Sequence, residues 1–120
     1  MMKKILVPFD GSETALRALE FAAGIGKPFC SEIMVVVRYN NIDYHNFAAK
    51  RFADAGCTTA SYRLIVDIDP AERILEYAKT AEDDMIVLGN RGMGMLAELL
   101  MGSVSMKISQ YAECPVVIVK

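Results

Sequence analysis

The sequence holds few of the residues that metal sites and disulfide frameworks need. Histidine occurs once, at position 45, and the three cysteines, Cys30, Cys57 and Cys114, form no Cys-x-x-Cys pair. An odd number of scattered thiols is typical of free cysteines in a reducing compartment. We therefore expect neither a zinc site nor a catalytic role for His45, which has no serine or cysteine partner nearby in the sequence.

Excess positive charge and long apolar runs are also missing. The formal net charge is −2, which gives no basic face for DNA or RNA. No apolar run approaches the roughly 20 residues of a membrane span. The chain starts with a strand-like segment over residues 3–7 and lacks the apolar region and cleavage site of a signal peptide. We expect a cytoplasmic protein that binds neither nucleic acid nor membranes.

The residues that are present describe a globular domain. Hydrophobic residues make up 53% of the 120 positions and charged residues 23%, a composition that excludes a disordered tail. This length suffices for one hydrophobic core but not for two. The prediction is a single domain over residues 1–120.

Short apolar runs alternate with amphipathic segments along the whole chain, which is typical of β-α-β units around a parallel sheet. The predicted strands cover residues 5–9, 33–37, 60–66, 85–88 and 116–119. Helices are predicted after Ser12, over 44–55, from Pro70, and from Gly102 to Ala112. Ser12 is expected to be an N-cap, and Asp69-Pro70 is a favourable helix start. The fold class is therefore α/β, an open doubly wound five-stranded parallel sheet with helices on both faces.

Glycines follow the fourth predicted strand in a spacing that suits a phosphate cradle. Gly89-Asn90-Arg91-Gly92 is followed, nine residues later, by Gly102-Ser103 at the start of the last helix. Such a loop presents backbone N–H groups to an anion, and the helix dipole favours negative charge there. The same glycines are equally explained as turn formers. The loop matches neither the phosphate-binding loop that ends in Gly-Lys-Ser/Thr nor the Gly-x-Gly-x-x-Gly dinucleotide motif.

Other polar residues lie where strands end. Asp10 follows the first predicted strand and faces the glycine loop if the first and fourth strands are neighbours, where it is either a ribose ligand or a turn residue. Ser103 and Ser105 are candidate phosphate donors. Arg91 is either a phosphate ligand or a solvated loop residue. Asp83 and Asp84 are expected to be solvated turn residues, and no carboxylate cluster suggests a metal held by the protein.

Three blocks of the sequence resemble the universal stress protein family. They are Lys4-Ile5-Leu6-Val7-Pro8-Phe9-Asp10-Gly11-Ser12-Glu13, the segment from Asp69 to Ala78, and the stretch from Ile86 to Val119. The last block carries the Gly-x2-Gly-x9-Gly-Ser pattern of the family's ATP-binding branch. The match departs from the family at Ile68, where a glycine is usual, at Val37-Arg38, and in a short segment after the second strand.

The resemblance implies an ATP-binding domain with strand order 3-2-1-4-5, usually a homodimer, with a regulatory role in stress. Asp10 would meet the ribose, and the backbone near Val37 or Arg38 would meet the adenine. The phosphates would be held by a further group of residues: Gly89, Arg91, Gly92, Gly102, Ser103, Val104 and Ser105. Mg²⁺ or Mn²⁺ would be carried on the phosphates.

Two functions remain open. The first is an ATP-binding regulatory protein with an unknown protein partner and at most slow hydrolysis, because no catalytic base or lysine is evident. The alternative is a dimeric interaction module that works without nucleotide. In both, residues 116–119 form an apolar strand that the implied order places at a sheet edge, so a homodimer through this strand is predicted. A nucleotidyl-transferase or pyrophosphatase is disfavoured, because Asp10-Gly11-Ser12 does not match the loops of those enzymes.

Overall fold

A computed structural model of the chain describes residues 3–10, 12–38, 50, 60–65, 70–90 and 102–120. The strands are β1 (Lys4–Phe9), β2 (Glu32–Arg38), β3 (Ala60–Ile65), β4 (Met85–Gly89) and β5 (Val116–Val119). The α-helices are α1 (Glu13–Gly26), α3 (Pro70–Ala81) and α4 (Ser103–Tyr111), and η1 (Lys27–Phe29) is a short 3-10 helix. The helix predicted over 44–55 lies outside the described residues.

The strands form one sheet in the order β3-β2-β1-β4-β5, and every neighbouring pair is parallel. β1 pairs with β2 over six residues, from Lys4–Glu32 to Phe9–Val37. Its ladder with β4 comprises two pairs near the strand starts, Ile5–Met85 and Leu6–Ile86. The predicted α/β class with a parallel sheet is confirmed.

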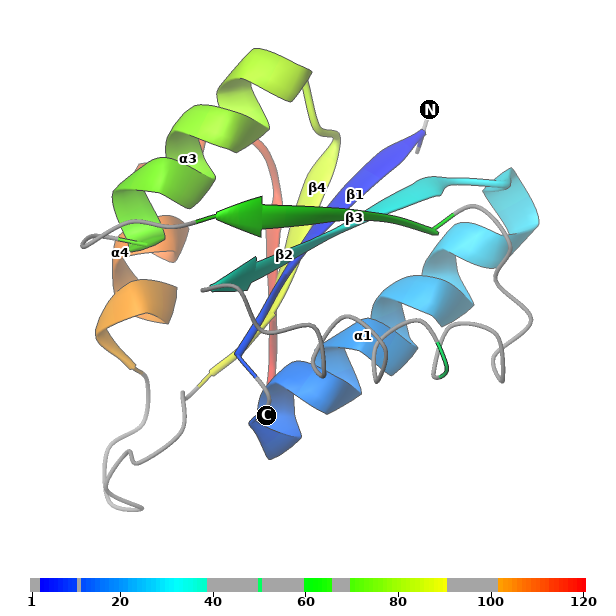
Figure 1. The fold of residues 1–120 in the computed structure, drawn as a ribbon, viewed down its shortest axis with the longest axis horizontal. Coiled ribbons are helices and arrows are strands. Elements are labelled where there is room, and N and C mark those ends of the chain that lie inside the picture. Colours follow the sequence, from blue (N-terminus) through cyan, green and yellow to red (C-terminus); the bar gives the residue numbers. More distant parts are fainter. Residues whose placement is uncertain (1–2, 11, 39–49, 51–59, 66–69, 91–101) are drawn as a thin grey trace.

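Helices cover both faces of this sheet (Figure 1). On one face, Ile5, Val7 and Phe9 of β1 pack with the buried stripe of α1. On the other face, Leu6 packs with Ile74 of α3 and Ile108 of α4. The apolar residues of β1 therefore serve two cores, because successive side chains of a strand point to opposite faces.

Helix α1 begins as the sequence predicts. The Ser12 hydroxyl accepts a hydrogen bond from the Ala15 N–H at 3.2 Å, and the Ser12 backbone is extended, as at an N-cap. Glu13 in the first turn adds favourable charge at the helix N-terminus and pairs with Arg17. The start of α1 is thereby held just beyond the end of β1.

The end of β4 lies directly against the first turn of α1. A Cβ built on Gly89 would lie 2.7 Å from the Ala15 nitrogen and still closer to Thr14 Oγ1. Glycine is required here because the backbone of one element approaches the backbone of the other. Among the described residues, no helix has both the length and the hydropathy to cross a bilayer.

Gly89→Ala is expected to destabilise the fold by about 1–3 kcal/mol, because the added methyl overlaps the α1 backbone. Gly24→Ala is the matched control, since a Cβ at this exposed position of α1 meets nothing within 4 Å. The control should gain about 0.5–1 kcal/mol from helix propensity. Urea unfolding of the two variants measures both values. Similar stabilities for the two variants would show that α1 and β4 are not in close contact.

Candidate functional site

The carboxyl ends of β1 and β4 lie side by side at one edge of the sheet. β2 and β3 extend from β1 in one direction, whereas β5 lies beyond β4 in the other. The strand order therefore reverses between β1 and β4. In open α/β sheets, ligands bind in the crevice beyond such a switch point.

Asp10 immediately follows β1 at this edge. The side chain is partly buried, and Oδ1 accepts a hydrogen bond from the Ser12 N–H at 2.9 Å. This contact is the turn role that the sequence left open for Asp10. It also fixes the carboxylate between β1 and the start of α1.

Three hydrogen bonds join the end of β4 to α4 and β5. The Ser105 hydroxyl donates to the Gly89 carbonyl at 2.6 Å, and the Gly102 N–H donates to the Asn90 carbonyl at 2.6 Å. The Asn90 N–H in turn donates to the Val119 carbonyl at 2.9 Å. The start of α4 is therefore tied to the end of β4, although eleven residues separate Asn90 from Gly102 in the sequence.

The N-terminus of α4 has no side-chain cap. Gly102 takes the N-cap position with an extended backbone, and no acidic residue lies in the first turn. The first N–H groups of a helix have no intrahelical acceptor, and the dipole places about half a positive charge there. Ser103, the first helical residue, is exposed. This arrangement favours an anion.

Most of the predicted site residues that the structure describes lie at this edge. Asp10 follows β1, Gly89 ends β4, and the start of α4 contributes four more residues, Gly102, Ser103, Val104 and Ser105. Val37 and Arg38 end β2, where Val37 pairs with Phe9 of β1 and Arg38 with Ile65 of β3. Arg91 and Gly92 lie outside the described residues.

Two residues act differently from the sequence expectation. The buried Ser105 hydroxyl donates to Gly89, so a phosphate contact from Ser105 would come from its backbone N–H. Gly89 has a packing reason for lacking a side chain, its contact with Thr14. Sequence reasoning did not single out Thr14, and no local pattern marks it, because the contact joins segments 75 positions apart.

No group of three histidine, cysteine or acidic residues within the described ranges is arranged to hold a metal ion. Cys30 is exposed and Cys114 is partly buried, and both are free thiols. Cys57 and His45 lie outside the described residues.

The model of the universal stress protein family matches residues 37–120. The chain belongs to this family. The matched segment contains β4, α4 and the whole glycine pattern.

Relatives of this universal stress protein align over its full length. It is 34% identical to a universal stress protein of Thermus aquaticus and 29% identical to the universal stress protein YxiE of Bacillus subtilis, with both chains fully covered in each comparison. A crystal structure of a universal stress protein in complex with cAMP is 27% identical, with a TM-score of 0.83 and coverage of 98% and 96%. The hypothetical protein MJ0577 is also 27% identical, with a TM-score of 0.82 and coverage of 100% and 96%.

Ser105→Ala is expected to destabilise the protein by about 1–2 kcal/mol, because the Gly89 carbonyl loses a buried donor. Ser109→Ala on the same helix is the matched control. The Ser109 hydroxyl is exposed and donates to the Met106 carbonyl of its own helix, so its removal should change stability by less than about 0.5 kcal/mol. Thermal unfolding of both variants tests the difference, and equal effects would contradict the tethering role of Ser105.

Proposed function

We propose that this universal stress protein binds an adenine nucleotide, primarily ATP, and acts as a stress-response regulatory protein. The observation that carries the proposal is the uncapped N-terminus of α4 beside the ends of β1 and β4. It combines the first N–H groups of a helix and their dipole with the edge of the sheet where the strand order reverses, which is where ligands bind in open α/β sheets.

The phosphates would bind the first turn of α4. The backbone N–H groups of Ser103, Val104 and Ser105 and the exposed Ser103 hydroxyl supply donors, and Gly102 adds no side chain that would cover them. Each charge-assisted hydrogen bond contributes about 1.5–3 kcal/mol. Four such bonds are enough for useful affinity. Gly89, Arg91 and Gly92 complete the phosphate end of the proposed site.

The nucleoside would extend away from α4 along the strand ends. Asp10 is placed for the ribose hydroxyls, since a carboxylate accepts hydrogen bonds, and the backbone at Val37 or Arg38 for the adenine edge. The 27% identical structure in complex with cAMP supports a ligand of this class, because cAMP contains an adenine, a ribose and a phosphate.

The residues that the structure describes fit phosphate better than a tightly bound metal. Mg²⁺ or Mn²⁺ would be carried on the nucleotide phosphates and water, with no ligand set from the protein. The sequence supplies no evident catalytic base and no lysine beside the glycine loop, so we expect hydrolysis to be slow at most. Nucleotide occupancy, rather than turnover, is the proposed signal to a protein partner.

Ser103→Asp is expected to abolish nucleotide binding without weakening the fold. An aspartate at the first helical position repels phosphate, yet it favours the helix dipole by about 0.3–1 kcal/mol. Ser103→Asn, a neutral side chain of the same shape, is the control and should lose only a few-fold in affinity. The measurements are mass spectrometry of nucleotide released from each purified protein and thermal shift with added Mg-ATP, ADP and cAMP.

Wild-type protein that is empty and shows no thermal shift with any of these nucleotides would overturn the proposal. That result would favour the second function, a dimeric interaction module of the same fold that works without nucleotide. Equal nucleotide binding by Ser103→Asp and Ser103→Asn would instead contradict the placement of the phosphates at the first turn of α4.

We also propose a homodimer through β5. This strand lies at the end of the sheet order, and its four apolar residues are only half-buried. The carbonyls of Pro115 and Val119 accept hydrogen bonds from the β4 side. The peptide groups of Val116 and Ile118 therefore point outward, since neighbouring residues of a strand alternate in direction. An outward row of this kind favours pairing with another copy.

Ile118→Pro should weaken the dimer by removing an outward N–H donor, whereas Ile118→Ala removes the same side chain and keeps the donor. Sedimentation velocity at micromolar concentration is expected to show a dimer for wild type and Ile118→Ala, and a monomer for Ile118→Pro. A monomeric wild type would contradict the proposed dimer.

A further inference from the structure

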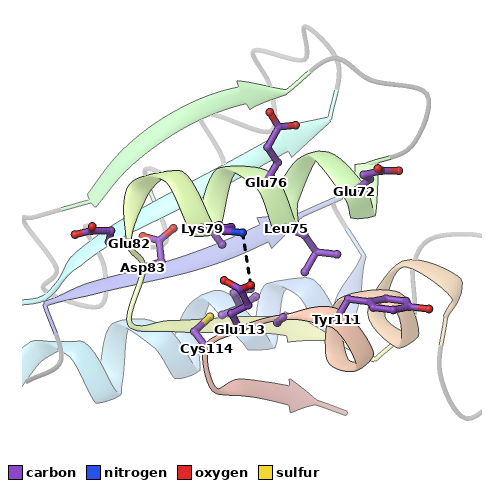
Figure 2. Close-up of a pocket in the computed structure, with 12 residues that line it drawn as sticks. Glu72, Leu75, Glu76, Lys79, Glu82, Asp83, Tyr111, Glu113 and Cys114 are labelled. Carbon is purple, nitrogen blue, oxygen red and sulfur yellow. Dashed lines mark ion pairs between the residues drawn. The ribbon is translucent and has the colours of Figure 1, made fainter.

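A groove of about 550 Å³ lies between α3 and the end of α4, away from the proposed nucleotide site at the carboxyl ends of β1 and β4. Figure 2 shows its lining, in which α3 runs along one side and the segment from Tyr111 to Cys114 lies opposite. Leu75, Ala78 and Ile86 contribute apolar surface. This volume is within the usual range of small-molecule sites.

Five acidic residues line this groove, Glu72, Glu76, Glu82, Asp83 and Glu113, and Lys79 is the one basic residue of its lining. Two further cations pair with this set, Arg73 with Glu76 at 3.5 Å and Lys107 with Glu72 at 3.8 Å. Lys79 pairs with Glu113 across the groove at 3.6 Å, and both side chains are more than 70% exposed. Such an exposed pair contributes little and is readily replaced by another cation. The groove runs along α3 from Glu72 in its first turn to Glu82 just past its end, and α4 ends there at Tyr111. The negative ends of two helix dipoles therefore lie at one end of the groove.

Asp83 is the buried member of the acidic set. It is only 8% exposed, and among the described residues Oδ2 has no hydrogen-bond partner. Burial raises the pKa of Asp83 to about 6, against a lowering effect of Lys4 and with smaller raising effects of Glu32 and Asp84. Burial raises the pKa of the Cys114 thiol too, and the neighbouring Asp83 charge adds to that shift. A buried carboxylate oxygen without a donor is a site for an incoming N–H group.

The end of α3 holds Glu82 and Asp83 in place. The Asp83 N–H donates to the Ala78 carbonyl at 3.0 Å, and Glu82 has a positive φ of 55°. This is the αL helix ending that glycine usually occupies. Here a glutamate takes that strained position, and its carboxylate stands at the rim of the groove.

We propose that this groove binds a linear aliphatic polyamine, with one terminal ammonium on Asp83 and the other amines along the carboxylates of Glu72, Glu76 and Glu113. Glu72 and Glu76 are four residues apart on α3, hence about 6 Å apart on one helix face. The methylene segments of the ligand would cover Leu75, Ala78 and Ile86. The proposal is independent of nucleotide binding.

A polyamine matches the groove better than a peptide or a metal ion. The carboxylates only accept hydrogen bonds, and an aliphatic polyamine only donates them. A peptide would bring backbone carbonyls as well, for which the lining side chains offer few donors, chiefly Lys79 and Tyr111. The described carboxylates also form no group of three arranged around one metal ion.

Isothermal titration of spermine, spermidine and putrescine into the full chain tests this proposal. Affinity should rise with the number of amines, and Asp83→Asn should weaken spermine binding at least tenfold. Glu20→Gln, on the exposed face of α1, removes the same charge far from the groove and is the control, with less than a twofold effect. Circular dichroism and thermal unfolding verify that Asp83→Asn is folded. Equal spermine affinity in Asp83→Asn and Glu20→Gln would overturn the proposal.

Lys79→Met provides a test with the opposite sign. It removes the cation that competes for Glu113, so spermine should bind several-fold more tightly. Because protonation neutralises Asp83, the affinity of the wild type for spermine should fall about fourfold from pH 7.5 to pH 5.5. The affinity of Asp83→Asn for spermine should not change over the same pH range. The charged groups around Asp83, namely Lys4, Glu32 and Asp84, are unchanged in that variant.

Two competing ligands complete the experiment. A lysine-rich peptide that binds more tightly than spermine, with the same dependence on Asp83, would overturn the polyamine assignment in favour of a protein partner. Mg²⁺ is the second competitor, added at the same concentration of positive charge as spermine. If it displaces spermine, the groove attracts counterions in general and the polyamine assignment is overturned. Spermine binding that Ser103→Asp leaves unchanged would support a groove separate from the nucleotide edge, whereas its loss there would contradict that separation.

Discussion

Residues 89 and 90 form the junction on which the carboxyl edge of the sheet depends. Gly89 lets β4 contact the first turn of α1 near Thr14, and its carbonyl accepts the Ser105 hydroxyl of α4. The Asn90 peptide then joins β5 through Val119 and α4 through Gly102. Two residues thus set the positions of two helix starts and the last strand. The proposed phosphate contacts at α4 depend on this junction, because the amides of a helix are directed only as precisely as its first turn is held.

The elements of the fold were predictable because their signals are local. Continuous apolar runs such as Ile33–Val37 mark strands covered on both faces, and Ser12 marks the start of α1 through its own hydroxyl. The glycine spacing also placed Gly89 at the end of a strand and Gly102 at the start of a helix, as the structure has them, whereas their role in binding a ligand stays a prediction. The structure describes that edge only in part, because 91–101 lie outside the described residues.

The roles of individual side chains were less predictable, because those roles come from contacts between distant segments. Asp83 was expected to be a solvated turn residue, but it is buried beside Lys4 and Cys114, which lie far from it in the sequence. Asp84, its neighbour, accepts hydrogen bonds from the Lys3 and Lys4 N–H groups at 2.8 Å, which lowers its pKa. Two adjacent aspartates in one turn thus have pKa values shifted in opposite directions. Asp83 and Asp84 are the same residue type at adjacent positions, so only their tertiary contacts account for the opposite pKa shifts.

The parallel topology also separates the two proposed sites by charge. Each helix that connects parallel strands runs antiparallel to them, so helix N-termini gather at the carboxyl edge of the sheet and helix C-termini at the amino edge. At the carboxyl edge, the uncapped start of α4 favours phosphate. At the other end, α3 and α4 finish beside Glu82, Asp83 and Glu113, and no basic residue lies in the last turn of α4 to offset its dipole. A cation at one end of α4 and an anion at the other would both be stabilised by the same helix dipole, so neither site requires a charge that opposes the fold.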